Sequence, residues 1–392
     1  MTAGIVCEYN PLHNGHLYHI EKTKAAGSDT VVCVMSGNFV QRGECALIDK
    51  WQRAVCAIRG GADIVLDLPT PWAVSSAENF ARGSVYILSA FGVDMLSFGS
   101  ETDDKELLKK CASATENEAV AGLIRKYMSE GMNYPSALSE AVARVYGEKA
   151  KKVISSPNST LGVEYIRWLR AYAPEKEFLP VERFGADHDS EAVSEGFASA
   201  SKIRSMLYDD VSAFVPGFMN ETIKNNMNNG TVHTLSKAER AILSSLREIP
   251  KEDYADFVTD GNGLSSRIYE GVKTAKSLSE LYEKAKSKNF THARVRREVL
   301  NLYLRIPRDM CCEVPPYIKI LAANERGLSL LSSAKENSSL PIVTKHADRE
   351  RLSVFGKAVY DLQCTCTDKF SLMCDNIRPC GEEQRSSMII IK

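Results

Sequence analysis

Short apolar runs alternate with helical patterns over the first hundred residues of the chain. Four runs have the length and β-branched content of buried strands, around residues 5–7, 30–35, 64–68 and 95–98. Between them, apolar positions recur at helical spacing at residues 46–59 and 75–91, and both patterns stop near a glycine. Strands separated by helices in this way indicate repeated βαβ units. We therefore expect a parallel sheet with helices on both faces.

The pattern changes further along the chain. Residues 103–173 are mainly helical, and a fifth strand-like run follows at 178–183. Beyond residue 206, helical spacing dominates to residue 305, and residues 315–344 form a mixed segment. The asparagine-rich stretch 220–230 is typical of a linker or loop. We predict an α/β fold: a Rossmann-like parallel-sheet domain with a helical insertion over residues 1–207, then a mainly α-helical domain over 208–392.

Composition adds limits to this picture. The 392 residues are 44% hydrophobic and 25% charged, with a formal net charge of −1, as in an ordinary globular protein. No apolar run approaches the ~20 residues that span a bilayer, so we expect a cytoplasmic protein. The eleven cysteines are scattered, and Cys364, Cys366, Cys374 and Cys380 lack paired C-x-x-C spacing. Unpaired thiols are favoured over a zinc site, and no metal ligands are assigned. The oligomeric state is not determined.

The first strand runs into Glu8-Tyr9-Asn10-Pro11-Leu12-His13-Asn14-Gly15-His16, where a helix should begin. A helix that starts after a strand presents free N–H groups and a positive dipole end to an anion. Gly15 allows close approach of the backbone, and His13 and His16 can both donate hydrogen bonds to phosphate oxygens. A surface turn or a pair of metal ligands would show the same four-residue motif, His13-Asn14-Gly15-His16. The position directly after a strand favours catalysis of adenylyl transfer.

A second motif, Ser199-Ala200-Ser201-Lys202-Ile203-Arg204, precedes another predicted helix. Ser199 or Ser201 suits the N-cap, and Lys202 and Arg204 are suited to reach an anion near the helix start. An early His-x-Gly-His with a late Ser/Lys/Arg motif is typical of the nucleotidyltransferase and class I synthetase superfamily. We therefore predict His13, His16, Lys202 and Arg204 as catalytic residues.

A basic stretch lies in the predicted helical half. Lys284, Lys286, Lys288, Arg294, Arg296 and Arg297 occur with no acidic residue between the first and the last. A local stripe of this kind binds nucleic acid even when the net charge of the protein is near zero. A solvated helix face is the alternative interpretation.

Longer strings carry a resemblance over nearly the whole chain. They include Asn10-Pro11-Leu12-His13-Asn14-Gly15-His16, Ser36-Gly37-Asn38-Phe39-Val40-Gln41-Arg42-Gly43, Phe80-Ala81-Arg82-Gly83, Phe98-Gly99-Ser100-Glu101 and Phe290-Thr291-His292-Ala293-Arg294-Val295-Arg296-Arg297. These strings resemble the bacterial tRNA(Met) cytidine acetate ligase family. Glu182 is a departure, because the family tends to carry a basic residue there.

The resemblance implies a two-step reaction. Acetate attacks ATP to give acetyl-adenylate and pyrophosphate, and the wobble cytidine of elongator tRNA(Met) then takes the acetyl group to form N4-acetylcytidine. Magnesium is expected with ATP. The family's ATP site falls on Val6, Cys7, Glu8, Tyr9, Asn10, Pro11, Leu12, His13, Asn14, Gly15, His16, Leu17, Tyr18 and His19, and on Gly99, Asn158, Arg183 and Phe184.

Several assignments remain open at the level of sequence. Lys288, Arg294, Arg296 and Arg297 are predicted to clamp the tRNA backbone. The segment 36–42 fits either a small carboxylate pocket or RNA steering. Glu8 and Glu101 are expected to be structural acceptors rather than bases. An adenylyltransferase for another carboxylate or a mononucleotide is the alternative enzyme, and a noncatalytic RNA-binding protein that keeps ATP as a ligand is the second alternative.

Overall fold

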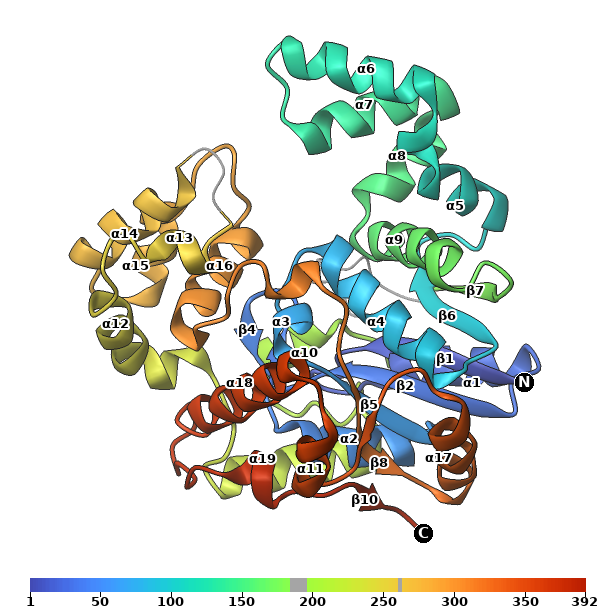
Figure 1. Ribbon diagram of the computed structural model, residues 1–392, viewed down its shortest axis with the longest axis vertical. Helices are drawn as coiled ribbons and strands as arrows, with labels where there is room; N and C mark the ends of the chain where they lie inside the picture. Colours follow the sequence, from blue (N-terminus) through green and yellow to red (C-terminus); the bar gives the residue numbers. More distant parts are fainter. Residues whose placement is uncertain (184–195, 260–262) are drawn as a thin grey trace.

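A twisted sheet of eight strands forms the centre of the protein (Figure 1), seen in a computed structural model that describes residues 1–183, 196–259 and 263–392. Its strands are β1 (Thr2–Cys7), β2 (Thr30–Ser36), β5 (Ile64–Leu68), β6 (Met95–Ser100), β7 (Glu177–Glu182), β8 (Ile318–Ala323), β9 (Ile342–Val343) and β10 (Ile389–Ile390). The strands β3 (Phe39–Val40) and β4 (Glu44–Cys45) form a separate antiparallel hairpin.

The strand order is β10-β8-β5-β2-β1-β6-β7, with β9 beside β8. The five strands expected from the sequence are all present and pair in parallel, which confirms the predicted α/β fold. The mixed segment expected at 315–344 contains β8, which the sequence did not single out as a strand and which pairs antiparallel with β5, so it extends the same sheet. All six residues of β8 are buried, so its sequence lacks the alternation of a half-exposed strand. The domain boundary expected at residue 207 stays a prediction, although segments on both sides of it share one sheet.

Helices cover both faces of the sheet and extend beyond it. Up to residue 172 they are α1 (Asn14–Ala25), α2 (Lys50–Arg59), α3 (Thr70–Ala73), α4 (Ala77–Phe91), α5 (Lys105–Ala112), α6 (Glu118–Ser129), α7 (Tyr134–Tyr146), α8 (Glu148–Ser155) and α9 (Pro157–Tyr172). From residue 200 they are α10 (Ala200–Ser205), α11 (Gly217–Asn228), α12 (Glu239–Arg247), α13 (Tyr254–Phe257), α14 (Leu264–Thr274), α15 (Leu278–Ala285), α16 (His292–Leu304), α17 (Glu325–Asn337), α18 (Val354–Phe370) and α19 (Glu382–Arg385).

Alternate residues of each strand enter two different cores. Val32 and Val34 of β2 pack with α4 and α9, whereas Val31 and Cys33 pack with α1 and α2 on the other face. Helices α5 to α8 form an arm between β6 and β7, and α12 to α16 form a second helical body with its own core (Figure 1). The carboxyl ends of β1, β6 and β7 lie between these two helical regions.

The segment 220–230 is not the linker that its asparagines suggested. Most of it belongs to α11, which buries Met219 and Ile223 against the sheet. Asn226 is buried as well, and its side-chain amide donates a hydrogen bond to Gln52 Oε1 at 2.7 Å. Asparagine lowers helix propensity, but tertiary packing overrides that preference here.

A buried ionic cluster joins the sheet to residues near position 383. Lys50 Nζ lies 2.5 Å from Asp67 Oδ2 and 2.8 Å from Glu383 Oε1, and Lys319 also pairs with Glu383. Burial raises the pKa of Glu383, but the ammonium groups of Lys319 and Lys50 outweigh it and lower that pKa to about 2. Two cations therefore balance two carboxylates inside the protein.

Within the described ranges, no helix has both the length and the apolar character needed to cross a membrane.

Candidate active site

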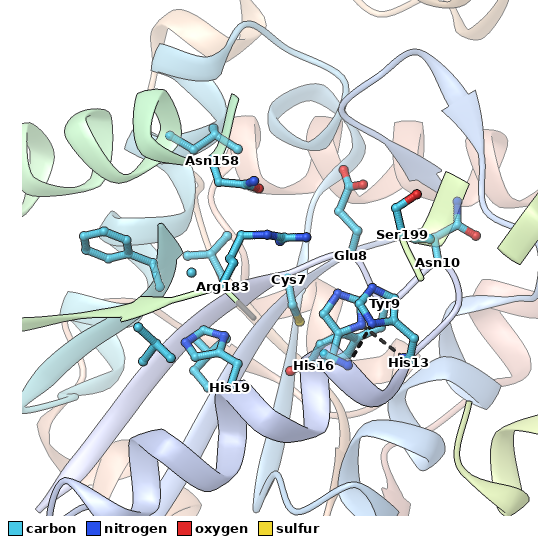
Figure 2. Close-up of a pocket in the computed structure, with 18 of the residues that line it drawn as sticks. Cys7, Glu8, Tyr9, Asn10, His13, His16, His19, Asn158, Arg183 and Ser199 are labelled. Atoms are coloured by element: carbon cyan, nitrogen blue, oxygen red, sulfur yellow. Dashed lines mark hydrogen bonds between the residues drawn. The ribbon is translucent and has the colours of Figure 1, made fainter. Parts of the chain in front are cut away.

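Helix α1 begins where the sequence predicted it, and its two histidines close the end of the helix. His13 is the N-cap, and its Nδ1 accepts a hydrogen bond from Gly15 N–H at 3.1 Å. His16 Nδ1 accepts from His13 N–H at 3.2 Å, which completes a reciprocal capping box. The two rings stack with centroids 3.6 Å apart (Figure 2). Both imidazoles therefore stand over the positive end of α1.

This bonding determines which ring nitrogen carries the proton. A neutral imidazole has one donor and one acceptor nitrogen, and Nδ1 is the acceptor in both His13 and His16. The proton of each neutral ring then lies on Nε2. Both side chains consequently present N–H donors of the kind that stabilise charge on phosphate oxygens.

A pocket opens at the carboxyl edge of the sheet around these histidines (Figure 2). The predicted ATP-binding residues that line it are Val6, Cys7, Glu8, Tyr9, Asn10, His13, Gly15, His16, Tyr18, His19, Gly99, Asn158 and Arg183. They come from β1, α1, β6, α9 and the end of β7. A crevice at this edge is where ligands bind in parallel α/β folds.

Other members of the expected ATP segment face away from the pocket or lie beyond description. Pro11, Leu12, Asn14 and Leu17 are not among the lining residues. Leu12 is buried in the core, and the Asn14 amide donates to Gly196 O at 2.8 Å and Ala213 O at 3.0 Å. These residues hold the loop in shape. Phe184 lies outside the described residues.

Arg183 and Asn158 define the wall opposite the histidines (Figure 2). The side chain of Arg183 lies over Gly99, where an added Cβ would stand 3.5 Å from Arg183 Cγ. Burial lowers the pKa of Arg183, while the carboxylate of Glu101 opposes that shift. Asn158 Nδ2 donates to Glu101 Oε1 at 2.7 Å. Glu101 is thus the structural acceptor that the sequence suggested, and its partners are Asn158 and Ser159.

His19 closes the far end of the pocket in a neutral state. Its Nε2 lies 2.9 Å from Ser97 Oγ. Burial, with a smaller contribution from nearby Arg183, lowers its pKa to about 4. His19 therefore carries no charge at neutral pH.

Of the predicted catalytic pair on α10, only Arg204 lines the pocket. Ser199 is the N-cap of α10, as expected, and accepts from Lys202 N–H. Arg204 donates to Asn10 O at 2.8 Å and to Glu44 Oε2 at 3.0 Å. Lys202 is partly exposed and is not among the lining residues, so its catalytic role stays a prediction.

Arg53 supports the site from below and was missed in the sequence. It is 1% exposed and donates to four carbonyl oxygens: Ile48 O, Glu8 O, Ser36 O and Gly37 O. It therefore ties the turns after β1 and β2 together. Burial lowers its pKa to about 10. A lone arginine on the apolar face of a predicted helix was the available signal.

The inner wall contains further residues that were not assigned. Gln41, Arg42, Phe80 and Tyr165 line the pocket together with Phe98. Four of these five, all but Tyr165, occur within the strings that carry the family resemblance. Their contact with the pocket follows from the return of α4 and α9 to one edge of the sheet, which sequence spacing does not show.

The predicted RNA-binding arginines are already engaged within the protein. Arg296 Nη1 lies 2.8 Å from Glu44 Oε1, Arg297 Nη1 donates to Gln41 O at 3.3 Å, and Arg294 donates to Thr259 O. Lys288 is exposed. The basic stretch is split, because α15 ends at Ala285 and α16 begins at His292. Its role in RNA binding stays a prediction.

The four cysteines of the carboxyl-terminal region do not gather. Cys364, Cys366 and Cys374 are buried, and Cys380 is exposed. In the part of the chain that the structure describes, no three His, Cys, Asp or Glu side chains are grouped as metal ligands.

The mainly parallel sheet, the capped histidines and the helix start at its carboxyl edge are typical of an α/β nucleotidyltransferase. A family model described as HIGH Nucleotidyl Transferase matches residues 1–385. A tRNA(Met) cytidine acetate ligase of Acetivibrio thermocellus is 34% identical over 413 aligned residues, with 100% of both chains covered. That of Caldicellulosiruptor saccharolyticus is 36% identical and covers 86% of this chain and 85% of its own.

Solved structures agree with these sequence matches. Thermotoga maritima TmcAL in its apo form superposes with a TM-score of 0.93 at 29% identity, covering 99% of both chains. The same protein bound with alpha-thio ATP gives a TM-score of 0.91. The chain belongs to the HIGH nucleotidyltransferase family and, within it, to the tRNA(Met) cytidine acetate ligases.

Proposed function

We propose that the protein activates acetate with ATP and transfers the acetyl group to the wobble cytidine of elongator tRNA(Met), forming N4-acetylcytidine. The observation that carries this proposal is the stacked pair of His13 and His16, which caps the positive end of α1 and lines the pocket. Membership of the ligase family supports the choice of substrates.

In the first step, an acetate oxygen attacks the α-phosphorus of ATP, and the bond to pyrophosphate breaks. Negative charge grows on the departing pyrophosphate, where His13, His16 and the dipole of α1 stabilise it. Arg183 contributes a fixed cation from the opposite wall. Asn158, held by Glu101, is placed to bind the sugar or base of the nucleotide.

In the second step, the exocyclic amine of cytidine attacks the acetyl carbonyl and AMP leaves. The tRNA approaches over α16, where Lys288, Arg294, Arg296 and Arg297 bind its phosphates. Because a tRNA is the acceptor, we place this reaction in the cytoplasm. Magnesium would accompany ATP and would neutralise part of the charge of its phosphates. Among the described residues, no three His, Cys, Asp or Glu side chains are grouped to hold the ion.

The test is direct. The purified protein is incubated with ATP, magnesium, isotopically labelled acetate and unmodified elongator tRNA(Met), and the digested RNA is examined by mass spectrometry. Labelled acetylcytidine is the expected product. Binding of ATP without this product overturns the proposal and favours an adenylyltransferase for another carboxylate or mononucleotide.

A further inference from the structure

Glu8 occupies a position in the pocket that its expected structural role does not explain. It follows β1 directly, and its side chain lies between the Asn158 wall and Ser199 (Figure 2). One carboxylate oxygen, Oε1, accepts from Gln41 N–H at 2.8 Å. Among the residues that the structure describes, the other oxygen has no hydrogen-bond partner, and the residue lines the pocket. Glu8 therefore holds a fixed acceptor oxygen toward the space where substrates meet.

The residue that fixes Glu8 also contacts the candidate RNA-binding helix. Gln41 donates its N–H to Glu8, and its carbonyl accepts from Arg297 of α16 at 3.3 Å. Two residues on, Gly43 has φ of +75°, and an added Cβ would lie 2.6 Å from Arg297 N. The turn from residue 41 to 43 is thus pressed between α16 and the pocket, and it brings Glu8 to the side from which the RNA is proposed to enter.

We propose that Glu8 accepts the proton that the cytidine amine loses during acetyl transfer. This inference rests on the proposed function. The amine nitrogen forms a bond to the acetyl carbon, and the bond from that carbon to the phosphate oxygen breaks with its electron pair going to AMP. The proton on the nitrogen passes to Glu8 Oε2. Glu8 is then a catalytic residue of the second step, not a structural acceptor.

The charged groups around Glu8 leave it suited to this role. Arg53 lies below it on α2, Arg204 on α10 and Arg42 on the turn after β3, while Tyr165 of α9 faces it from the inner wall. Burial raises the pKa of Glu8, and the three guanidinium groups and the Gln41 bond oppose that shift. The raised pKa makes the Glu8 carboxylate a stronger base than an exposed glutamate.

The experiment measures the two steps separately in Glu8→Gln. Acetate-dependent exchange of pyrophosphate into ATP reports adenylate formation, and single-turnover labelling of the tRNA reports acetyl transfer. We expect transfer to fall about 100-fold, and by much more than exchange. Wild-type transfer should decline as pH falls through the Glu8 pKa, and this acidic limb should be absent in Glu8→Gln. An equal loss in both steps overturns the proposal.

Two further variants keep the result decisive. Glu164→Gln changes a partly buried glutamate of α9 that does not line the pocket, and it should match wild type in both steps. Glu8→Asp keeps a carboxylate, so it should recover part of the transfer rate and the acidic limb. Transfer equal to that of Glu8→Gln in this variant, with normal exchange and thermal unfolding, contradicts a proton acceptor. A wild-type protein that exchanges pyrophosphate but yields no acetylcytidine refutes the proposed function itself.

Discussion

At the carboxyl edge of the sheet, the histidines and Arg53 bond to backbone groups of the turns that carry them. On α16, by contrast, Arg296 pairs with the Glu44 carboxylate. The first arrangement fixes the orientation of these side chains before ATP binds. The second requires an arginine to exchange its carboxylate for an RNA phosphate. The histidine end of the pocket is therefore preformed, whereas the proposed RNA site on α16, like Arg204 in the pocket, would have to give up an ion pair with Glu44.

Removing one of the preformed donors should give the largest effect. In His16→Ala, we expect acetate-dependent pyrophosphate exchange to fall about 100- to 1000-fold, because a donor to the developing charge is lost. The free energy of unfolding should fall by only about 1 kcal/mol, because one helix-capping hydrogen bond is lost. His346→Ala, a histidine beside Tyr360, serves as the control. Wild-type exchange in His16→Ala would refute the catalytic assignment.

Arg53 tests whether the pocket depends on its support from below. Arg53→Met leaves four carbonyl oxygens without their donor, so we expect the free energy of unfolding to fall by about 3 kcal/mol. ATP affinity should fall with it. Arg59→Met, at the exposed end of the same helix, should change stability by less than about 0.5 kcal/mol. Denaturant unfolding measures the free energy of unfolding of both variants. An equal loss in Arg53→Met and Arg59→Met would contradict a supporting role for Arg53.

A pH series tests the burial of His233, which lies between α11 and α12 and packs against α18. His233 is 2% exposed and stacks on Phe370, and burial lowers its pKa from 6.5 to about 4. The unfolded chain therefore binds a proton below pH 6.5 that the folded chain does not. Stability should fall between pH 6.5 and 4, by up to about 3 kcal/mol from this group. His233→Phe should flatten that part of the curve, and an unchanged slope would contradict the assignment.

The exchange of partners on α16 predicts a smaller effect, confined to RNA. In Arg296→Ala we expect tRNA binding to weaken about 10-fold at low salt and the slope against log salt to fall by about 1. Pyrophosphate exchange should change far less. Filter binding measures the tRNA affinity, with Arg240→Ala of α12 as the control. If pyrophosphate exchange falls as much as tRNA binding, Arg296 has a structural role.

The smallest expected effect is a gain in tRNA affinity. Glu44 holds both Arg204 and Arg296, so Glu44→Gln should release charge toward RNA. We expect tRNA binding at low salt to tighten about 2-fold, as for the loss of one partly exposed ion pair. Weaker binding in this variant would mean that Glu44 positions the arginines instead of neutralising them.

Local patterns predicted the parallel part of the fold well. Strands β1, β2, β5, β6 and β7 each correspond to a predicted apolar run, and α10 begins after Ser199, one of the two caps that its sequence suggested. Strand β8 was missed, because a strand buried on both faces has no alternation and its pairing with β5 spans about 250 residues of sequence.

The residues of the site likewise fall into those that the sequence revealed and those that it did not. His13, His16, Asn158 and Arg183 were found through motifs and a family resemblance, and the structure brings them to one pocket. Arg53 was missed, and Gln41 was included only as part of the open segment 36–42, because their roles depend on which carbonyls and carboxylates the fold places beside them. Those neighbours come from other elements, so no spacing in the sequence records them.

The antiparallel strand β8 has a consequence for how the protein is made. During synthesis, β5 emerges long before residues 318–323, so its edge has no partner until most of the chain has left the ribosome. Lys50 and Asp67 likewise wait for Glu383 to complete their charge balance. The nascent chain therefore leaves one edge of β5 unpaired for most of its translation. An unpaired strand edge promotes aggregation, so chaperone binding and the speed of translation should affect the folding yield.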